Sequence, residues 1–555
     1  MNKVDYVNKM NAILSDETKF CKMVKEKDKT HLIEKIISKV LRTMKQDGYI
    51  DAHTFSRIHP TGCTIPRLYG LPKVHKPGLP LRPILDMFNS PYHSLAKWLV
   101  EVLEPIRKEL TIHSLKDTFQ FVDRINDLQL NEHYMFSLDV ESLFRNVPLR
   151  ETVDYICDYI DHTGREIGIP TTLLKRLILL CTENIQFQFN NGIYRQKDGV
   201  AMGSPIGPLL ANIFMSKLET QKLSLVINKL TCYCRYVNDI FVIAKNTMDL
   251  NEVLNLFNSV HVNTKFSVER EADGHLSFLD VNVIKRTDGT LKREIFRKPI
   301  WTGQYLHFDS FVPLRQKRNL VRFLTERAIK ICSTDTVEKE LDFLKQIFDQ
   351  NGYPSRFIVK TMERGKPMTK SVSVPKKRVY ISLPFKGEVL AELITRRLRN
   401  ATENTYMAST LSLSFSSRVF IKSHLKDKLP QSTASYCVYH FECSCRASYV
   451  GRTTRRLSDR IREHCPASLT RGLPTSNASS IALHIAETAH VTNASQAFKI
   501  VYRVPRNRSQ PIRFRLLSIA EAIAIRLLNP ELCIQKKFVR SLNLCWPSVN
   551  PLSQI

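Results

Sequence analysis

The sequence has no uninterrupted apolar run of about 18 residues, the length that a helix needs to span a membrane. Its first 14 residues mix Asn, Lys and Asp, whereas a secretory signal needs a continuous apolar stretch. It has no internal repeat and no low-complexity tract either. We therefore expect no membrane partner and a nuclear or cytoplasmic location.

Acidic residues are few compared with basic ones. Asp and Glu total 53, Lys and Arg total 82, and the formal net charge is +29 in a chain of 555 residues. A polyanionic partner is the simplest physical reason for this surplus, and a merely basic, solvated surface is the alternative. The 13 cysteines are an odd number without a secretory signal, so most are best interpreted as reduced thiols.

The pattern of apolar residues predicts a mixture of helices and strands, and hence an α+β fold. Residues 66–91 are rich in proline and carry basic side chains, which favours a β-hairpin over a long helix. A basic helical region at 310–365 is a plausible nucleic-acid-gripping face, although a solvated helix face explains any single charge equally well. Further helices are expected near 95–108, 150–160, 170–183 and 388–399, and strands near 134–140, 185–195, 232–244, 277–285, 379–385 and 410–421.

Three separated segments carry polar residues where strand ends or turns are expected. The first is SLDVESLF, in which Asp139 ends an apolar strand. The second is DGVAMGSPIGPLLANIFM, in which a tight turn at 203–205 precedes a helix and lets the backbone approach a ligand. The third is CRYVNDIFVI, which places Asn238 and Asp239 at the tip of a hairpin.

These segments have the residue types that phosphoryl transfer needs. Transfer between a chain end and a nucleoside triphosphate uses two divalent ions about 3.5 to 4 Å apart, held by carboxylates, because the attacking and departing oxygens both gain negative charge. Acids on two adjacent strands provide this geometry. Each segment alone also fits an ordinary turn or cap, but in this order, after a basic hairpin, they form a specific signal.

At these residues the sequence resembles reverse transcriptases, and among them those of the Penelope-like retroelements. The resemblance covers almost the whole chain, and the segments that carry it are LYGLPKVHKPGLPLRPI, SLDVESLFRNVPL, GVAMGSPIGPLLANIFM, RYVNDIFVI, FLDVNVIKR and FRKP. The resemblance implies a right hand of fingers, palm and thumb. Such an enzyme copies an RNA template into DNA from a DNA primer, using deoxynucleoside triphosphates and Mg²⁺ (or Mn²⁺).

The resemblance also implies units and roles. Asp139 is implied as a metal ligand, and Phe144 as a steric gate against a ribose 2′-hydroxyl. Lys73 and Arg82 are implied to neutralise the incoming triphosphate, for which an ammonium and a guanidinium are suited. The implied loop that positions the template and the incoming base consists of Gly203, Ser204 and Pro205. The implied units are a helical lead-in at 1–55, fingers and palm at 56–300, a helical thumb at 301–370, a connector at 371–430 and an endonuclease domain at 431–545.

The chain departs from this family at Asn238, where members generally carry the first of two adjacent aspartates, a metal ligand. An amide is neutral and offers one carbonyl oxygen, so the site loses a full negative charge. Asp239 is expected to substitute in part as a metal ligand. We expect weakened metal affinity and a rate loss of roughly a thousandfold or more, about 4 kcal/mol of transition-state stabilisation.

A second compact unit is expected from about residue 432. Residues 446–471 contain seven arginines against Asp459 and Glu463, which fits a phosphate-facing surface. Later, LLSIAEAIAIRLLNP predicts an amphipathic helix whose lone acid, Glu521, sits among apolar residues and needs a metal or a partner. The arrangement resembles the GIY-YIG nucleases, the endonuclease domain attached to many Penelope-like elements.

Within this resemblance Tyr439 and Tyr449 match the two motif tyrosines, one of which acts as general base or orients water. Arg460 corresponds to the phosphate-stabilising arginine, and Glu521 to the carboxylate that holds the divalent metal, Mg²⁺. The glycine of the first motif is replaced by Cys437, which puts the backbone fit of the first strand in doubt.

A zinc site is the second metal prediction for this unit. Cys443 and Cys445 lie between the two tyrosine motifs, and His484 and His490 follow downstream. Two thiolates and two imidazoles can close a tetrahedral Zn²⁺ site, a pattern that the attached nuclease of these elements resembles. His464 is a competing ligand or a phosphate contact, and two buried thiols with surface histidines are the alternative interpretation.

Three functions stay open at this point. The first is a retroelement polymerase with a linked endonuclease, which nicks target DNA and primes synthesis from the new end. The second is a non-catalytic remnant that binds RNA or single strands, and the third is a nuclease joined to an inactive polymerase. The PKKR segment at 375–378 is either a nuclear import signal or a basic loop, and the sequence does not decide the oligomeric state.

Overall fold

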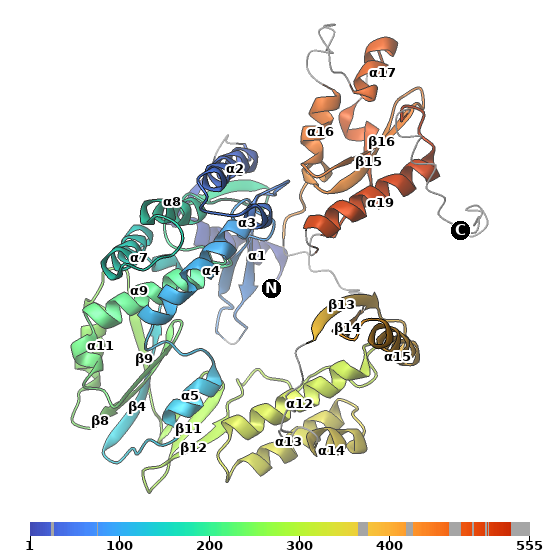
Figure 1. Ribbon diagram of the computed structural model, residues 1–555. Coiled ribbons are helices and arrows are strands. Elements are labelled where there is room, and N and C mark those ends of the chain that lie inside the picture. The colour runs from blue at the N-terminus through green and yellow to red at the C-terminus, as the bar shows by residue number, and fades with distance from the viewer. Residues whose placement is uncertain are drawn as a thin grey trace.

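The computed structural model confirms the α+β class (Figure 1). Hydrophobic side chains gather in four separate cores: a large one in the N-terminal half, one beside it, one in a helical bundle and one in the C-terminal unit. The structure describes residues 1–23, 27–74, 76–363, 376–417, 426–465, 479–490, 493–505, 508 and 510–533.

A four-stranded antiparallel sheet, in the order β7-β8-β4-β9, is the centre of the N-terminal half and is called the palm below. The two middle strands read as nearly continuous apolar runs because both faces of the sheet are covered. Ile240 and Val242 point into the large core, whereas Phe241 and Ile243 point into the neighbouring core on the other face. The strands are β4 (His133–Val140), β7 (Cys232–Tyr236), β8 (Asp239–Lys245) and β9 (Phe266–Arg270).

Helices fill both cores beside the palm. Those with buried residues in the large core include α4 (His93–Leu110), α7 (Leu149–Thr163), α8 (Thr171–Thr182), α9 (Gly207–Gln221), α10 (Ser224–Ile227) and α11 (Leu250–Ser259), and the short α6 (Leu143–Asn146). The neighbouring core contains α5 (Thr118–Ile125) and a three-stranded sheet of β10 (His275–Phe278), β11 (Val281–Lys285) and β12 (Leu291–Ile295).

The predicted basic hairpin at 66–91 is confirmed and belongs to a five-stranded sheet, called the fingers below, in the order β1-β6-β5-β2-β3. Its prolines lie beside the ends of strands, in turns or on the edge strand β3, where a missing N–H costs least. The fingers comprise β1 (Phe20–Lys22), β2 (Arg67–Pro72), β3 (Leu81–Asp86), β5 (Gln186–Phe189) and β6 (Gly192–Gln196), packed with α1 (Lys3–Leu14), α2 (Thr30–Gln46) and α3 (Ala52–Ile58).

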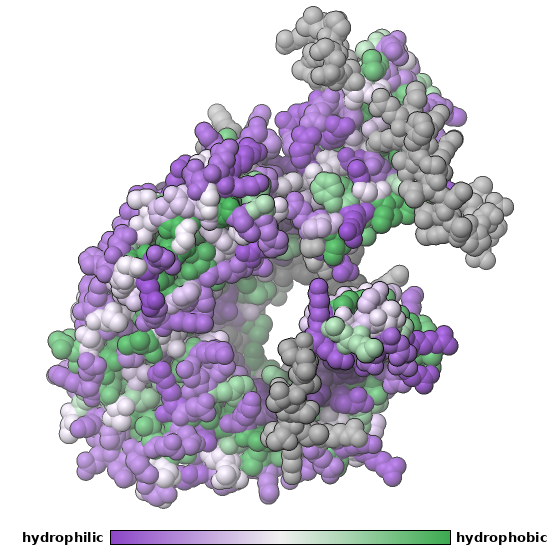
Figure 2. Space-filling model, viewed as in Figure 1, coloured by the Kyte–Doolittle hydropathy of each residue, from purple (hydrophilic) through white to green (hydrophobic). Residues whose placement is uncertain are grey.

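The helices expected at 310–365 form a bundle with its own core, called the thumb: α12 (Leu314–Ile331), α13 (Val337–Gln350) and α14 (Ser355–Glu363). Figure 2 shows a hollow between this side of the molecule and the N-terminal half. Four of the six basic side chains of α12 are exposed and two are engaged within the protein, so a gripping surface on this helix stays a prediction. Lys317 is buried over Phe308, and Arg327 is ion-paired with Asp280.

A small β–α–β module follows the thumb: β13 (Lys377–Pro384), α15 (Glu388–Thr405) and β14 (Ser409–Ser416), with the two strands parallel. It is attached to the start of α12, where the Glu388 carboxylate accepts a hydrogen bond of 2.8 Å from the Leu314 N–H and Phe311 contacts Phe385. Of the PKKR segment, Pro375 lies outside the described residues and the other three positions begin or precede β13.

The C-terminal unit has a sheet in the order β16-β15-β17 and docks on the fingers. The Arg456 guanidinium, 8% exposed, donates to the Cys63 carbonyl at 2.7 Å and lies 3.5 Å from Asp28. Its elements are η1 (Gln431–Thr433), β15 (Cys437–Glu442), β16 (Ser448–Thr453), α16 (Leu457–His464), α17 (Ser480–Thr488), α18 (Ala494–Ala497), β17 (Phe498–Arg503) and α19 (Gln510–Leu528). The end of the expected unit, 534–545, lies outside the described residues.

Among the helices in the described ranges, none is long and apolar enough to cross a membrane.

Candidate functional site

The two acids predicted to hold metal lie directly opposite each other in the palm. Asp139 on β4 pairs with Asp239 on β8, so two residues 100 positions apart in sequence are cross-strand neighbours. The pairing follows from the antiparallel register, because each acid lies at the end of its strand nearest the β7–β8 turn. The carboxylate site predicted from sequence is therefore brought together.

The turn that carries Asn238 is unusually tight. Val237 has a φ of +58°, a left-handed conformation that β-branched residues rarely adopt. Two contacts hold it: the Asn238 carbonyl accepts from the Val140 N–H at 3.0 Å, and the Val237 carbonyl accepts from the Arg235 guanidinium at 3.2 Å. The turn is thus fixed from both sides, and the side chain at 238 is directed at the carboxylates.

Asn238 bridges the two acids. Its amide nitrogen donates to Asp139 Oδ1 at 2.5 Å and to Asp239 Oδ1 at 3.2 Å. An amide N–H donor here faces the oxygens that a cation would otherwise contact, and it partly compensates their charge. The donor set is two carboxylates and one amide, which still suits a divalent cation but carries one negative charge fewer than three carboxylates would.

The pKa of Asp239 reflects its burial and the nearby carboxylate of Asp139. Burial and, second, the nearby Asp139 charge raise its pKa to about 6, against the opposing influence of Lys298 and Arg82. Like charges held close together are typical of sites that bind cations, because a cation relieves the repulsion.

The predicted triphosphate-binding cations lie close enough to interact electrostatically with the carboxylates. Burial, followed by Lys76 and Arg82, lowers the pKa of Lys73, whereas Asp139 raises it. Arg82 lies on β3 opposite Leu71 of β2, and the Lys73 N–H donates to the Pro80 carbonyl at 2.9 Å. The fingers hairpin thus holds two cations within electrostatic reach of the palm acids.

The loop at 203–205 packs against this hairpin. Gly203 has a φ of +118°, and a Cβ there would lie 2.2 Å from the Leu85 carbonyl oxygen, so only glycine fits. The Leu85 N–H donates to the Met202 carbonyl at 2.8 Å, which joins the loop to β3. Ser204 is 4% exposed, and Pro205 follows it just before α9.

The predicted steric gate, Phe144, is half-buried on α6 beside the same loop. Its carbonyl accepts from the Val200 N–H at 2.7 Å, and its ring lies 3.7 Å from the position of a Cβ at Gly207. Phe144 is therefore held against Val200 and Gly207, on either side of the 203–205 loop. The structure brings all the predicted polymerase residues to one region.

Sequence reasoning missed a buried ion pair behind this site. Arg235 and Glu219 are 0% and 1% exposed, and Arg235 donates to Glu219 at 2.5 Å. Arg235 also donates to the Asn212 side-chain oxygen at 2.7 Å, and the Tyr233 hydroxyl donates to Glu219 at 3.0 Å. The network ties α9 to the turn that carries Asn238. Lys298, in the FRKP segment, is the other residue missed.

The C-terminal unit has a second polar cluster. The Tyr439 hydroxyl lies 2.6 Å from His464 Nε2 and accepts from Arg460 Nε at 3.2 Å. Burial raises the pKa of Tyr439, and Arg460 opposes this. Gly451 pairs with Tyr439 across the strands, and a Cβ there would lie 2.5 Å from the tyrosine hydroxyl, so the YVG glycine is required. The ring of Tyr449 lies 6.4 Å from that of Tyr439.

Glu521 is 8% exposed on α19 and has a cationic neighbour, because Arg452 Nε lies 3.1 Å from its carboxylate. Most of the described arginines of 446–471 form ion pairs within the protein, and the phosphate-facing surface stays a prediction. Arg455 and Arg460 pair with Glu463, and Arg462 pairs with Asp459. Arg471 lies outside the described residues.

The four predicted zinc ligands lie together. Their ligand atoms are all within 4.8 Å of one another, with Cys443 Sγ 3.4 Å from His490 Nδ1 and Cys445 Sγ 3.3 Å from His484 Nε2. Sulfur and nitrogen bound tetrahedrally to Zn²⁺ lie about 3.6 Å apart, so the geometry fits the ion. Burial raises the pKa of Cys443, but hydrogen bonds from Cys445, His484 and His490 outweigh it and lower the pKa to about 6. His464 does not belong to this cluster, so the expectation that it competes as a zinc ligand is wrong.

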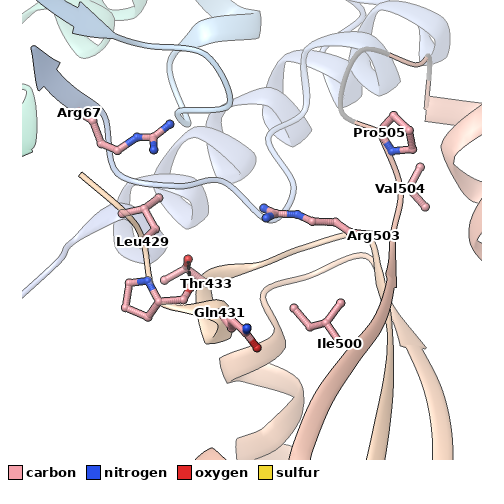
Figure 3. Close-up of a pocket in the computed structure, with 9 residues that line it drawn as sticks. Arg67, Leu429, Gln431, Thr433, Ile500, Arg503, Val504 and Pro505 are labelled. Carbon is pink, nitrogen blue, oxygen red and sulfur yellow. Dashed lines mark hydrogen bonds between the residues drawn. The ribbon is translucent and has the colours of Figure 1, made fainter. Parts of the chain in front are cut away.

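A pocket of about 450 Å³ lies where the fingers meet the C-terminal unit. Figure 3 shows Arg67 of β2 and Arg503 of β17 extending toward it from opposite sides. Arg67 is engaged by Asp86 and by the Asp427 carbonyl. None of the lining residues belongs to either polar cluster, so this pocket is part of the seam between the two units.

Comparisons with known proteins bear on these sites. Residues 74–271 match the family model "Reverse transcriptase (RNA-dependent DNA polymerase)", and residues 304–363 match "Animal helix-turn-helix domain". A search of curated proteins gave no match.

Solved structures with similarity include two telomerases and a viral polymerase. Telomerase from Candida tropicalis is 14% identical, with a TM-score of 0.38, over 64% of this chain and 63% of that one. Telomerase from Candida albicans, in complex with a fragment of telomeric RNA, is 10% identical, with a TM-score of 0.39, over 64% and 68%. The Sicinivirus RNA-dependent RNA polymerase is 12% identical, with a TM-score of 0.37, over 57% and 71%.

Proposed function

We propose that this chain, whose residues 74–271 form a reverse transcriptase domain, is a retroelement-encoded RNA-directed DNA polymerase of the Penelope-like kind, impaired by Asn238. The observation that carries the proposal is the cross-strand pairing of Asp139 and Asp239 beside Lys73 and Arg82. The partners would be an RNA template, a DNA primer and deoxynucleoside triphosphates.

Each of these residues would have its own role in nucleotide addition. Lys73 and Arg82 would bind the triphosphate and offset its charge, and Phe144 would exclude a ribose 2′-hydroxyl. The rigid loop at 203–205 would position the template and the incoming base. Asp139 and Asp239 would hold divalent cations, Mg²⁺ or Mn²⁺, which stabilise the charge of the entering and leaving oxygens when bound. Asn238 would weaken the binding of these cations, because its amide donates to the same carboxylates.

Primer extension on an RNA template tests this proposal. We expect the chain as given to extend a primer slowly, and Asn238→Asp to raise the rate by roughly a thousandfold, which corresponds to about 4 kcal/mol. Asp139→Asn in the Asn238→Asp background is the matched control and should abolish extension. Equal, robust extension with and without Asn238→Asp would contradict the assignment of position 238 as a metal ligand.

A non-catalytic remnant is the alternative for this half of the chain. It would bind RNA or single strands in the hollow between the N-terminal half and the thumb without extending a primer. The same assay separates the two, because a remnant would bind the template-primer duplex yet stay inactive after Asn238→Asp.

The second candidate function is a linked GIY-YIG-like endonuclease that cuts target DNA for target-primed insertion. The contacts of Tyr439 with His464 and Arg460, with Glu521 on α19 close by, favour it. The buried tyrosine would orient water, Arg460 would stabilise the phosphate, and Glu521 would hold Mg²⁺. Glu521→Ala should abolish plasmid nicking, whereas Glu531→Ala, an exposed acid just beyond the same helix, should not. Unchanged nicking in Glu521→Ala would refute this site.

The cluster of Cys443, Cys445, His484 and His490 would hold a structural Zn²⁺ beside this nuclease site. The clustered ligand atoms and the lowered pKa of Cys443 support it, because a thiolate is the form that binds zinc. We propose that the protein acts in the nucleus or the cytoplasm.

A further inference from the structure

The β13–α15–β14 module has a parallel pair of strands, and among the residues that the structure describes, only one of its two faces is covered. Parallel sheets are nearly always covered on both faces, and a two-stranded sheet is marginal by itself. Figure 1 shows the module at the end of α12 that is away from α5 and β11, with α15 on one side of the strand pair. The face of the β13–β14 pair opposite α15 is called the open face below.

Side chains alternate between the two faces of the pair. Leu411 and Leu413 of β14, 4% and 6% exposed, face α15, where Ala391 is 5% exposed. In the parallel register Val379 and Ile381 of β13 lie opposite them and share that face. These apolar residues explain why α15 packs where it does.

The other face carries a different set of side chains. Tyr380 is at its centre and is 72% exposed, and Arg378 lies two positions away on the same strand. Within the described part of the chain, neither side chain has a hydrogen bond or an ion pair. Hydroxyl residues surround them: Ser382 on β13 and Thr410, Ser412 and Ser414 on β14.

We propose that this open face binds single-stranded nucleic acid, with a base stacked on Tyr380 and a phosphate on Arg378. An exposed ring on a sheet face stacks on bases of any sequence, and hydroxyls offer hydrogen bonds to sugars and base edges. Charge favours this occupant over a protein partner. Residues 376–417 contain seven Lys or Arg and three Glu, a net +4, and the face has one aromatic residue rather than an apolar patch. This inference does not depend on polymerase activity.

Photocrosslinking of the full chain tests the proposal at the site itself. The probes are a uridine oligoribonucleotide and a thymidine oligodeoxynucleotide, and the readout is the nucleotide adduct in tryptic peptides. Cleavage after Arg378 and Lys386 isolates residues 379–386, whereas Tyr406, exposed in the same module, falls in residues 400–418. We expect the adduct on 379–386 at Tyr380.

Variants then separate stacking from general charge. Tyr380→Phe should keep both the crosslink and the affinity, because a phenyl ring still stacks. Tyr380→Ala should lose the crosslink and weaken short-oligonucleotide binding roughly 5- to 150-fold. Tyr406→Ala is the matched control and should change neither. Arg378→Gln should lower the slope of log affinity against log salt by about 0.7, the value for one phosphate of a single strand.

Three results would overturn the proposal. The first is an adduct elsewhere and none on 379–386. The second is equal affinity in Tyr380→Ala and the parent chain. The third is competition by duplex DNA as strong as that by single strands, which would make the face a mere basic patch. Stronger competition by one of the two probes shows whether the open face prefers RNA or DNA, and either preference supports the proposal.

Discussion

Removal of Arg235 should destabilise the palm far more than removal of an exposed arginine. The substitution Arg235→Ala leaves Glu219, which is 1% exposed, without its cation, and it also removes donors to Asn212 and to the carbonyl of Val237. Breaking a buried pair from one side costs about 3–5 kcal/mol, because the remaining charge stays desolvated. The Tyr233 hydroxyl still donates to Glu219 and offsets a part of this cost.

The assay is urea unfolding, with hydrogen exchange read on the peptides of α9 and of the β7–β8 turn. Arg150→Ala is the matched control, because Arg150 pairs with Glu183 on the surface with 74% of its side chain exposed and should cost no more than about 1 kcal/mol. The double variant Arg235→Met/Glu219→Leu should recover most of the loss, since an apolar pair leaves no buried charge. A loss in Arg235→Ala no greater than in Arg150→Ala would refute the structural role of the pair.

Three other predictions concern the loop, the acids and the zinc ligands. Gly203→Ala should cost at least about 1–3 kcal/mol in thermal unfolding, because its Cβ meets the Leu85 carbonyl, whereas Gly78→Ala, with no atom within 4 Å, should cost less; equal costs would contradict the close approach. Mn²⁺ affinity, measured by paramagnetic resonance, should rise from about pH 5 to 7 as Asp239, with its pKa raised to about 6, loses its proton, and Asp239→Asn should flatten this rise. The same raised pKa means that folding stability from this group is present at low pH and is lost as the pH rises through about 6, because the folded state binds the extra proton. Cys445→Ser should lower the zinc content measured by mass spectrometry from one ion per chain toward none, and an unchanged content would exclude that cluster.

Much of the N-terminal half could be predicted because its features appear as short sequence patterns and as the order of motifs along the chain. The apolar runs around Asp139 and Asp239 predict strands, and the proline-rich basic stretch predicts the fingers hairpin; the structure confirms both. The order of the motifs indicated that the two acids would meet, and the register places them opposite each other.

The features that were missed depend on tertiary packing. In the sequence Arg235 is one of 82 basic residues, and nothing local shows that its partner on α9 is buried with it. The same holds for α12, whose helix was predicted but whose Lys317 turns inward over an aromatic ring. His464 was a candidate zinc ligand by spacing alone, whereas its contacts are with Tyr439 and Ser479.

Iron-directed cleavage tests most directly whether the palm acids hold a cation. Fe²⁺ substituted for Mg²⁺, with ascorbate and peroxide, generates hydroxyl radicals that cut the backbone next to the bound ion. We expect cuts beside both Asp139 and Asp239, stronger in Asn238→Asp and absent in Asp139→Asn. Cleavage of Asn238→Asp at neither acid, or at only one of them, would contradict the shared cation site.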